Sequence, residues 1–476
     1  MRAIRELKAN ERENYDLLLT GVKEVQGRNG SFCVLTFRPG KNERQIEARM
    51  WKCTREKVLE LTPEMTVVNV FLTGNEYNGE LGYIADTMVP ANGKAADEFL
   101  QTGRASGKEM YAYIVRLIEK NCMDHAAAVP ALNLLREHEK ELIEWPAAMR
   151  VHHAYKGGLA SHLGACAGAC IKAASVISPA SVSAIRKKDT KSILNCIYRG
   201  ISSRTKGPLA ELAKSILKKC TVSPIHDNVI EKALTMLLAD RISKCYPFID
   251  TDLLYAAIAL RGCSIFSGNG LAQVIGVPAA DAQIIADEAG DKKDSEAVRM
   301  LIHCVLVDDT NDRRAAIPEA FLAHELGKVA RLAAENADAG KLDASCMAIA
   351  AAVHDIGKLK ELSSDGYGNA DYQVDGNLFG HTQIGIRMLI QEAVKCGVDA
   401  SSIGDVLHCM ASHHGKAEWG ALMPPASYEA KVVAAFDYID SRLDIFDTCA
   451  KALQEGEKDE SVRKYTGNIV YRRLPG

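Results

Sequence analysis

The sequence lacks several features that mark specialised classes of protein. It has no uninterrupted apolar run of about 18 residues, as a membrane span requires, and its first residues, MRAIRELKANERENYDLLL, are too charged for a secretory signal. It has no CxxC pair, and its 14 cysteines stand singly in apolar contexts such as LGACAGACIKAA. These absences predict a cytoplasmic protein with reduced thiols and no membrane partner.

The chain also lacks an excess of positive charge. Lys and Arg total 58 against 61 Asp and Glu, a net charge of -3, so any site for a polyanion must be local. At 476 residues the chain exceeds what one hydrophobic core usually serves, which predicts more than one domain.

The spacing of apolar and polar residues changes along the chain. From about residue 14 to residue 90, apolar and polar residues alternate and turn signals occur at GRNG, RPGKN and GNEYNGELG. This predicts an antiparallel barrel of about five strands. From residue 107 onwards, Ala- and Leu-rich segments have helical periodicity, and the Ser-, Lys- and Arg-rich segment 178–227 predicts a solvated insertion.

A set of histidines and aspartates in the second half indicates a metal site. AIAAAVHDIGKLKEL places His354 and Asp355 side by side at the end of an apolar helix, so both can point into one cavity. Neutral imidazoles and carboxylates together bind first-row divalent metals. The other members are His381 in LFGHTQIG, His413 and His414 in MASHHGKAEWG, and Asp437 and Asp440 in AAFDYIDSRL.

This set resembles that of the HD superfamily of metal-dependent phosphohydrolases. The stretch HHAYKGGLASH, from His152 to His162, more particularly resembles the start of the HD domain in YhaM-type 3′-to-5′ exoribonucleases. Those enzymes join an N-terminal OB-fold to an HD domain. The resemblance implies an α+β multidomain protein with an OB-like, nucleic-acid-binding β-barrel followed by a mainly α-helical HD body.

The first metal ligand has two candidates. After YPFIDTDLLYAAIAL, where the YhaM-type pattern would have a His-Asp doublet, this chain has Arg261 and Gly262. One alternative is a degenerate HD-like repeat followed by an intact repeat whose first ligand is His324. The other is a single HD domain with His162 as first ligand and a long insertion before the doublet. We favour the first alternative.

The favoured alternative divides the chain into five segments. These are an OB-like domain at 1–92, a helical linker at 93–149, a degenerate HD-like repeat with an insertion at 150–315, a catalytic HD domain at 316–452 and a polar tail at 453–476. We also expect self-association, because apolar Ala-rich helices offer contact surfaces.

The resemblance implies roles for individual residues. Asp355 would bridge two divalent ions, and Lys358 would steady a phosphate oxygen. We expect Mn²⁺, with Fe, Zn, Mg or Co as alternatives. The ligands of the two ions would be His324, His354 and Asp437 on one and His381 and His413 on the other. Further candidate ligands are His162, His414 and Asp440, the last with the alternative role of orienting Arg442.

Candidate substrate contacts lie in two places. In the barrel, rings such as Phe37 and Trp51 could stack on bases or form the core. Before the first HD helix, His152, His153 and Tyr155 could line a substrate channel or form a structural turn.

The leading functional hypothesis is a metal-dependent 3′-5′ exonuclease that hydrolyses single-stranded RNA or DNA, with RNA favoured. One alternative is an HD phosphohydrolase of small nucleotides such as a dNTP, a cyclic dinucleotide or an alarmone. Another is a nucleic-acid-binding scaffold without activity, which the replacement of a doublet by Arg261 and Gly262 suggests.

Overall fold

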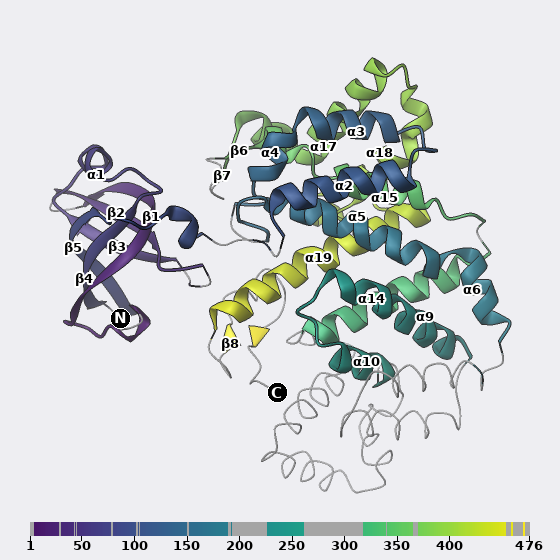
Figure 1. Cartoon of the computed structure of the whole chain (residues 1–476), viewed down its shortest axis with the longest axis horizontal. Helices are drawn as coiled ribbons and strands as arrows, with labels where there is room; N and C mark the ends of the chain where they lie inside the picture. The colour runs from purple at the N-terminus through teal and green to yellow at the C-terminus, as the bar shows by residue number, and fades with distance from the viewer. Residues whose placement is uncertain are drawn as a thin grey trace, which may run out of the picture.

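The computed structural model describes residues 4–27, 30–41, 43, 45–77, 80–100, 103, 105–149, 152–188, 192, 226–260, 318–338, 340–364, 370–453, 458–459 and 470–471. Arg261 and Gly262, much of the expected insertion and most of the tail lie outside these residues, so the predictions made there stay predictions. The described residues form a β-barrel and, beside it, a helical body (Figure 1).

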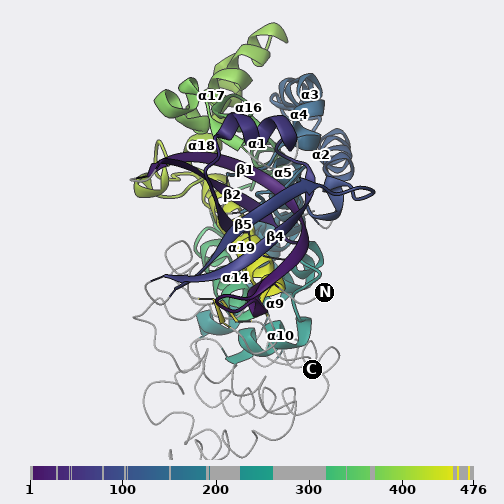
Figure 2. The same cartoon turned by 90° about the vertical axis from the view of Figure 1, so that its left-hand side faces the viewer.

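The N-terminal strands close into a barrel with the order β1-β2-β3-β5-β4. β3 and β5 pair in parallel, and the other neighbours pair antiparallel. The strands are β1 (Arg12–Gly27), β2 (Gly30–Arg38), β3 (Ile46–Trp51), β4 (Val67–Tyr77) and β5 (Glu80–Pro90). A short helix, α1 (Arg55–Leu61), lies between β3 and β4. The expected OB-like barrel is thereby confirmed; it faces the viewer in Figure 2.

Alternation along the strands explains the barrel and corrects one prediction. In β2, Cys33, Leu35 and Phe37 point into the barrel core, while the residues between them are partly exposed. Phe37 is fully buried, so its ring is a core side chain and is not available to stack on a base. Trp51 is half exposed and lies 4.8 Å from the ring of Phe32. A role for Trp51 in substrate binding stays a prediction.

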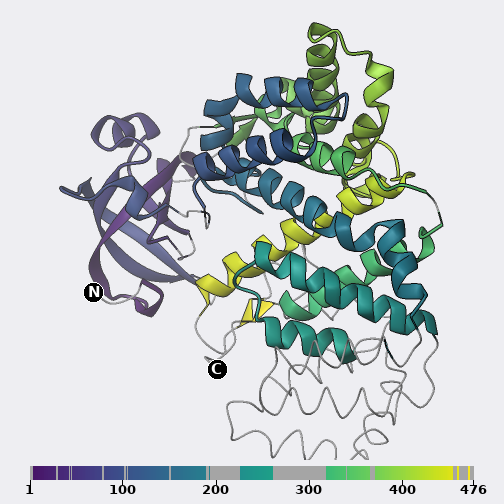
Figure 3. The same cartoon turned by 45° about the vertical axis from the view of Figure 1, so that its right-hand side comes forward.

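The helical body surrounds one continuous apolar core. Its central helix, α5, packs against α2, α15 and α19 (Figure 3). The helices are α2 (Gly107–Asn121), α3 (Ala128–Glu137), α4 (Glu139–Glu144), α5 (Gly158–Ile177), α6 (Pro179–Arg186), α9 (His226–Ile242), α10 (Thr251–Leu260), α14 (Pro318–Glu335), α15 (Ala344–Val353), α16 (Lys358–Glu361), α17 (Val374–Lys395), α18 (Gly404–Ser412) and α19 (Tyr428–Ala452). Two short strand pairs are β6 (Leu362–Ser364) with β7 (Ala370–Tyr372), and β8 (Lys458–Asp459) with β9 (Val470–Tyr471).

The shared core corrects the expected division of the body. Ile114 of α2 and Leu135 of α3 belong to the same core as α5 and α15, so segment 93–149 is part of the body and not a linker. α5 and α15, which were expected in separate repeats, pack directly on each other. In the described residues the helices of both expected repeats therefore share one core, and the bounds 150–315 and 316–452 stay a prediction.

Small residues allow α5 to lie deep in the body. Gly164 and Gly168 face α2, where an added Cβ would lie 2.5 Å from Met110 Cε and 2.6 Å from Tyr113 Oη. Among the described helices, α5 is long and apolar enough to cross a membrane, but 67% of that apolar window is buried in the body. Packing inside the core accounts for its composition.

Candidate metal centre

Three side chains from helices far apart in sequence meet in the core of the body. His162 lies near the start of α5, His354 directly follows α15, and Asp437 lies on α19. His162 Nε2 is 3.2 Å from His354 Nε2 and 3.1 Å from Asp437 Oδ1, and His354 Nε2 is 3.7 Å from the same oxygen. We call these three residues the inner group. Both of its histidines are fully buried.

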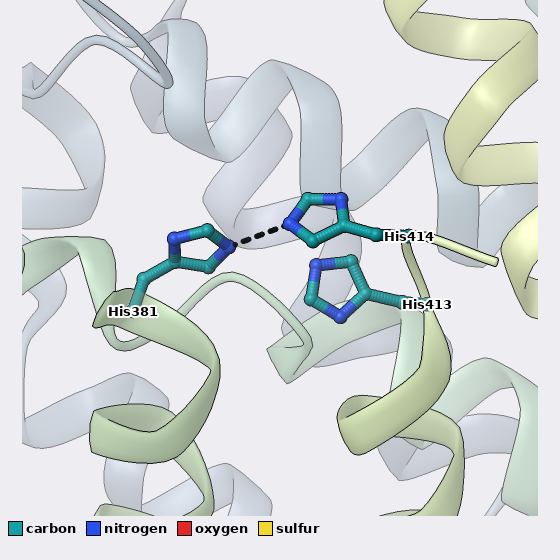
Figure 4. Close-up of side chains that lie close together, drawn as sticks. All are labelled: His381, His413 and His414. Carbon is teal, nitrogen blue, oxygen red and sulfur yellow. Dashed lines mark hydrogen bonds between the residues drawn. The ribbon is translucent and has the colours of Figure 1, made fainter. Parts of the chain in front are cut away.

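Three further histidines, His381, His413 and His414, form the outer group (Figure 4). His381 follows Gly380, whose φ of 70° breaks the helical geometry of α17, and the other two follow α18. His381 Nε2 lies 3.0 Å from His414 Nε2, and the ring centres of His413 and His414 are 4.0 Å apart.

Asp355 lies between the two groups. Its Oδ2 is 3.6 Å from Nε2 of both His162 and His354. Its Oδ1 is 3.3 Å from His381 Nε2 and 3.5 Å from His413 Nε2. Each oxygen of this carboxylate therefore faces a different group, which is the arrangement that a shared ligand needs.

Backbone carbonyls orient two of the histidines. His354 Nδ1 lies 2.9 Å from the carbonyl oxygen of Ala351, and His413 Nδ1 lies 2.6 Å from that of Met410. Because a carbonyl oxygen only accepts hydrogen bonds, Nδ1 donates in each case. The lone pair of each neutral ring is therefore on Nε2, the nitrogen that faces Asp355.

Carboxylates orient two more histidines in the same way. His162 Nδ1 is 2.7 Å from Asp440 Oδ2, and His381 Nδ1 is 3.0 Å from Glu361 Oε1. An ionised carboxylate accepts these hydrogen bonds and again leaves Nε2 to face the centre. Metal-binding histidines usually have such a partner on the other ring nitrogen.

The atoms that converge on the centre fit a divalent metal. Within the part of the chain that the structure describes, Asp355 Oδ1 and His413 Nε2 are buried and have no hydrogen-bond partner. A buried polar atom left without a partner costs about 1–3 kcal/mol. Imidazole lone pairs and carboxylate oxygens are ligands that first-row divalent ions prefer, so a cation would satisfy these atoms. The chemistry of the donors thus agrees with divalent metal binding.

The charge states of the side chains suit this role. Burial opposes ionisation of Asp355, but Lys358 and the neighbouring histidines hold its pKa well below the usual value. Burial also opposes ionisation of Asp437, but hydrogen bonds from His162 and His354 outweigh it and hold the pKa of Asp437 well below its usual value. Burial lowers the pKa of His413 and lowers that of His414 to about 3. At neutral pH the centre thus offers ionised carboxylates at Asp355 and Asp437 and neutral imidazoles at His413 and His414.

Lys358 lies inside the centre and not on an exposed helix end. Its Nζ is 2.6 Å from Asp355 Oδ2, and the side chain is buried. The turn before it needs Gly357, because a Cβ there would lie 1.9 Å from the carbonyl oxygen of His381. The ion pair fixes the shared carboxylate, whereas the expected contact of Lys358 with a phosphate oxygen stays a prediction.

Asp440 supports the inner group by a hydrogen bond to His162, on the ring nitrogen that faces away from the centre. Besides His162 Nδ1, its Oδ2 accepts a hydrogen bond from His153 Nε2 at 2.8 Å. His153 Nδ1 lies 2.8 Å from Tyr155 Oη, and the backbone N–H of His153 donates to Asp444 at 2.6 Å. His153 and Tyr155 are largely buried but line a cavity that Tyr246 and Phe248 also line, so their expected role in a substrate channel stays a prediction. They belong to a network that holds Asp440.

One other expectation changes with this network. Asp440 was expected to orient Arg442, but it binds the two histidines, and the Arg442 guanidinium lies 5.0 Å from the ring centre of Tyr438. His152 lies with its ring centre 5.6 Å from that of His162. Its expected contact with substrate stays a prediction.

The preference for His324 as first ligand is corrected by the geometry. His324 lies on α14 and belongs to none of the groups of described His, Cys, Asp and Glu side chains that are close enough to share an ion. His162 belongs to two of these groups, although it precedes His354 by 192 residues. The geometry therefore favours His162 over His324 as the first ligand.

Comparison with known proteins agrees with this centre. Residues 322–442 match the family model of the HD domain, a range that contains His354, Asp355 and Asp437 but begins after His162. The 3′-5′ exoribonuclease YhaM of Bacillus subtilis is 34% identical over 152 residues, which make up 32% of this chain and 48% of the relative. YhaM of Halalkalibacterium halodurans is 30% identical over 131 residues, or 28% of this chain and 40% of the relative.

The chain thus spans about half the length of the curated relatives that it matches. No solved structure gives a significant match. The matches confirm the resemblance of this chain to HD-type, metal-dependent hydrolases.

Proposed function

We propose that this chain is a metal-dependent phosphodiesterase that removes nucleotides from the 3′ end of single-stranded RNA. The observation that carries the proposal is the buried centre, in which Asp355 faces two sets of imidazole nitrogens. Two further observations support the substrate class. OB-like barrels bind single strands, and the similar YhaM proteins are named 3′-5′ exoribonucleases.

The proposed site holds two divalent ions. The inner group would hold one ion and the outer group the other, with Asp355 shared between them. Mn²⁺ is our preferred ion, with Fe, Zn, Mg or Co as alternatives. The imidazoles among the ligands disfavour Mg²⁺, which takes oxygen-richer sites. Bound there, the ions would supply Lewis acidity and positive charge for the attack of water on a phosphodiester.

The chain's own residues position this chemistry. Hydrogen bonds at Nδ1 fix the planes of four of the five imidazoles, and Lys358 holds Asp355 in place. Burial of His162 and His354 excludes water from the inner side. The barrel would bind the strand, and no side chain needs to act as a nucleophile.

The direct test is release of mononucleotides from a 5′-labelled single-stranded RNA in the presence of Mn²⁺. The wild-type protein should shorten the strand from its 3′ end, and Asp355→Ala should lose at least about 1,000-fold in rate, because it removes the carboxylate shared by both groups. Asp371→Ala, which changes an exposed carboxylate on β7, is the matched control and should retain activity.

Equal activity of the wild-type protein and Asp355→Ala would refute the proposed mechanism. Hydrolysis of a dNTP, a cyclic dinucleotide or an alarmone, without action on RNA, would replace the proposed substrate with a small nucleotide. Preference for single-stranded DNA would change the substrate but not the chemistry. A cytoplasmic location and self-association are further proposals, which fractionation and light scattering would test.

A further inference from the structure

The two groups differ in their exposure to solvent. His162 and His354 have no exposed side-chain surface, whereas the side chains of His381 and His414 are 16% and 23% exposed. A polymeric substrate cannot pass through the core, so it must reach the centre from the side of the outer group. Residues beside His381 and His414 are therefore the first that a strand would meet.

A short loop after His414 is fixed against the outer group. Gly420 lies so close that an added Cβ would be 3.3 Å from His414 Cδ2, and its φ of 105° favours glycine. The N–H of Leu422 donates to the carbonyl of Ala411 at 2.9 Å, which ties the loop back to α18. The residue before Gly420, Trp419, is consequently held beside the centre by backbone contacts.

Trp419 presents an unusual surface at this position. Its side chain is 48% exposed, although a large apolar ring is normally buried. The indole lies parallel to the ring of Tyr438, with centres 5.6 Å apart and planes 6° apart. The ammonium of Lys416 lies 4.6 Å from the centre of the indole. Tyr438 thus fixes the plane of an exposed ring that has a cation next to it.

These are the features of sites that bind single-stranded nucleic acid. Bases stack on exposed aromatic rings whatever their sequence, and nearby Lys or Arg side chains bind the phosphates. The Lys416 side chain is 59% exposed and, in the described part of the chain, forms an ion pair with exposed Glu418 at 3.4 Å. Exposed pairs of this kind contribute little, so the ammonium can move from the indole to a phosphate when a base takes its place.

We propose that Trp419 is a stacking platform for a nucleobase at the 3′ end of the bound strand, and that Lys416 binds the adjoining phosphate. The inference rests on the proposed function, because it assigns the substrate of the same centre. It explains why a ring is exposed beside His414, and it places recognition of the strand end on the helical body as well as on the barrel.

Binding to the full-length, metal-free protein tests this inference without catalysis. The probes are a fluorescein-labelled RNA 12-mer and the same strand with abasic ribose at its last three positions. Trp419→Ala should weaken binding of the intact RNA by roughly 5- to 150-fold, the range for loss of one base stack. The abasic strand should bind the wild-type protein and Trp419→Ala about equally.

Three further variants separate stacking from damage to the loop. Trp419→Tyr keeps a ring and should bind almost as the wild-type protein does, whereas Trp419→Leu keeps apolar volume without a ring and should lose affinity as Trp419→Ala does. Met423→Ala removes another exposed apolar side chain from the same loop and should have no effect. Unchanged affinity of Trp419→Ala and Trp419→Leu for intact RNA, or an equal loss on both strands, would overturn the inference.

Kinetics with Mn²⁺ distinguish this inference from the proposed function. In an active enzyme, Trp419→Ala should raise KM for the intact RNA and leave kcat almost unchanged. A wild-type protein that binds RNA through Trp419 but releases no nucleotides would refute the proposed function alone. An active wild-type enzyme whose Trp419→Ala variant has the same KM would refute the stacking platform alone.

Discussion

The inner and outer groups use similar side chains in different surroundings. The inner group is buried in the core, and Asp440, itself held by His153, supports it through His162. The outer group is partly exposed, and Glu361 supports it through His381. The comparison teaches that one centre can combine a rigid, water-free side with a side open to substrate. Variants that disturb one group and spare the other test this division.

Among variants that disturb one group and spare the other, the largest effect should follow from removing the first inner ligand. His162→Ala should lose metal from the inner group and reduce activity by more than about 100-fold, since loss of a group that only supports a ligand already costs about 10–100-fold. His324→Ala, the matched control on α14, should keep wild-type metal content and activity. Metal analysis by mass spectrometry and the RNA assay would measure both. Loss of metal in His324→Ala, with retention in His162→Ala, would reverse the assignment.

A smaller effect should follow from removing the supports of the ligands. Asp440→Asn and Glu361→Gln should each lower metal affinity or activity by about 10–100-fold. Asp440→Asn should be the more severe, because its carboxylate accepts hydrogen bonds from His153 and His162, whereas Glu361 contacts a partly exposed histidine. Titration of the metal-free variants with Mn²⁺ gives the comparison. A more severe loss in Glu361→Gln would mean that the outer group depends more on its support.

The smallest effect concerns pH in the chelator-treated protein. Burial disfavours a charge on His162, but hydrogen bonds to Asp437 and Asp440 outweigh it and raise its pKa to about 9. A raised pKa stabilises the fold fully below the unfolded value of about 6.5, and this contribution is lost as pH rises through about 9. The unfolding temperature should therefore fall by a few degrees between pH 6.5 and pH 9.5. The fall should be smaller in His162→Asn, and an identical fall would exclude this histidine as the source.

Residue patterns predicted the barrel and most of the centre. Alternation and turn signals indicated the five strands that close into the barrel, because side-chain direction in a strand follows directly from sequence position. His354 and Asp355 could be predicted because adjacent residues at a helix end share one location. Phe37 could not be assigned from the pattern, since a ring in a strand has the same local sequence whether it faces the core or the solvent.

Contacts between distant segments were harder to predict. His162 and His354 are 192 residues apart, and helical periodicity describes each helix without saying which helices pack together. Glu361 was missed for a related reason: it lies in KLKEL, where its spacing is typical of an exposed helix face. The carbonyls of Ala351 and Met410, which orient His354 and His413, leave no signal in the side-chain sequence.

The position of His162 on α5 also makes the centre tolerant of change in the chain that follows. The centre depends on α5 packing against α15, and not on the length of chain between them. The entropy cost of closing a loop rises only by about 0.6 kcal/mol for each doubling of its length. The chain between the two helices includes α9 and α14, which pack in the same core, so only the segments that connect such helices can gain or lose residues while the ligands stay in place. The fold therefore keeps the ligand positions fixed, while segments that can change in length are where new functions can evolve.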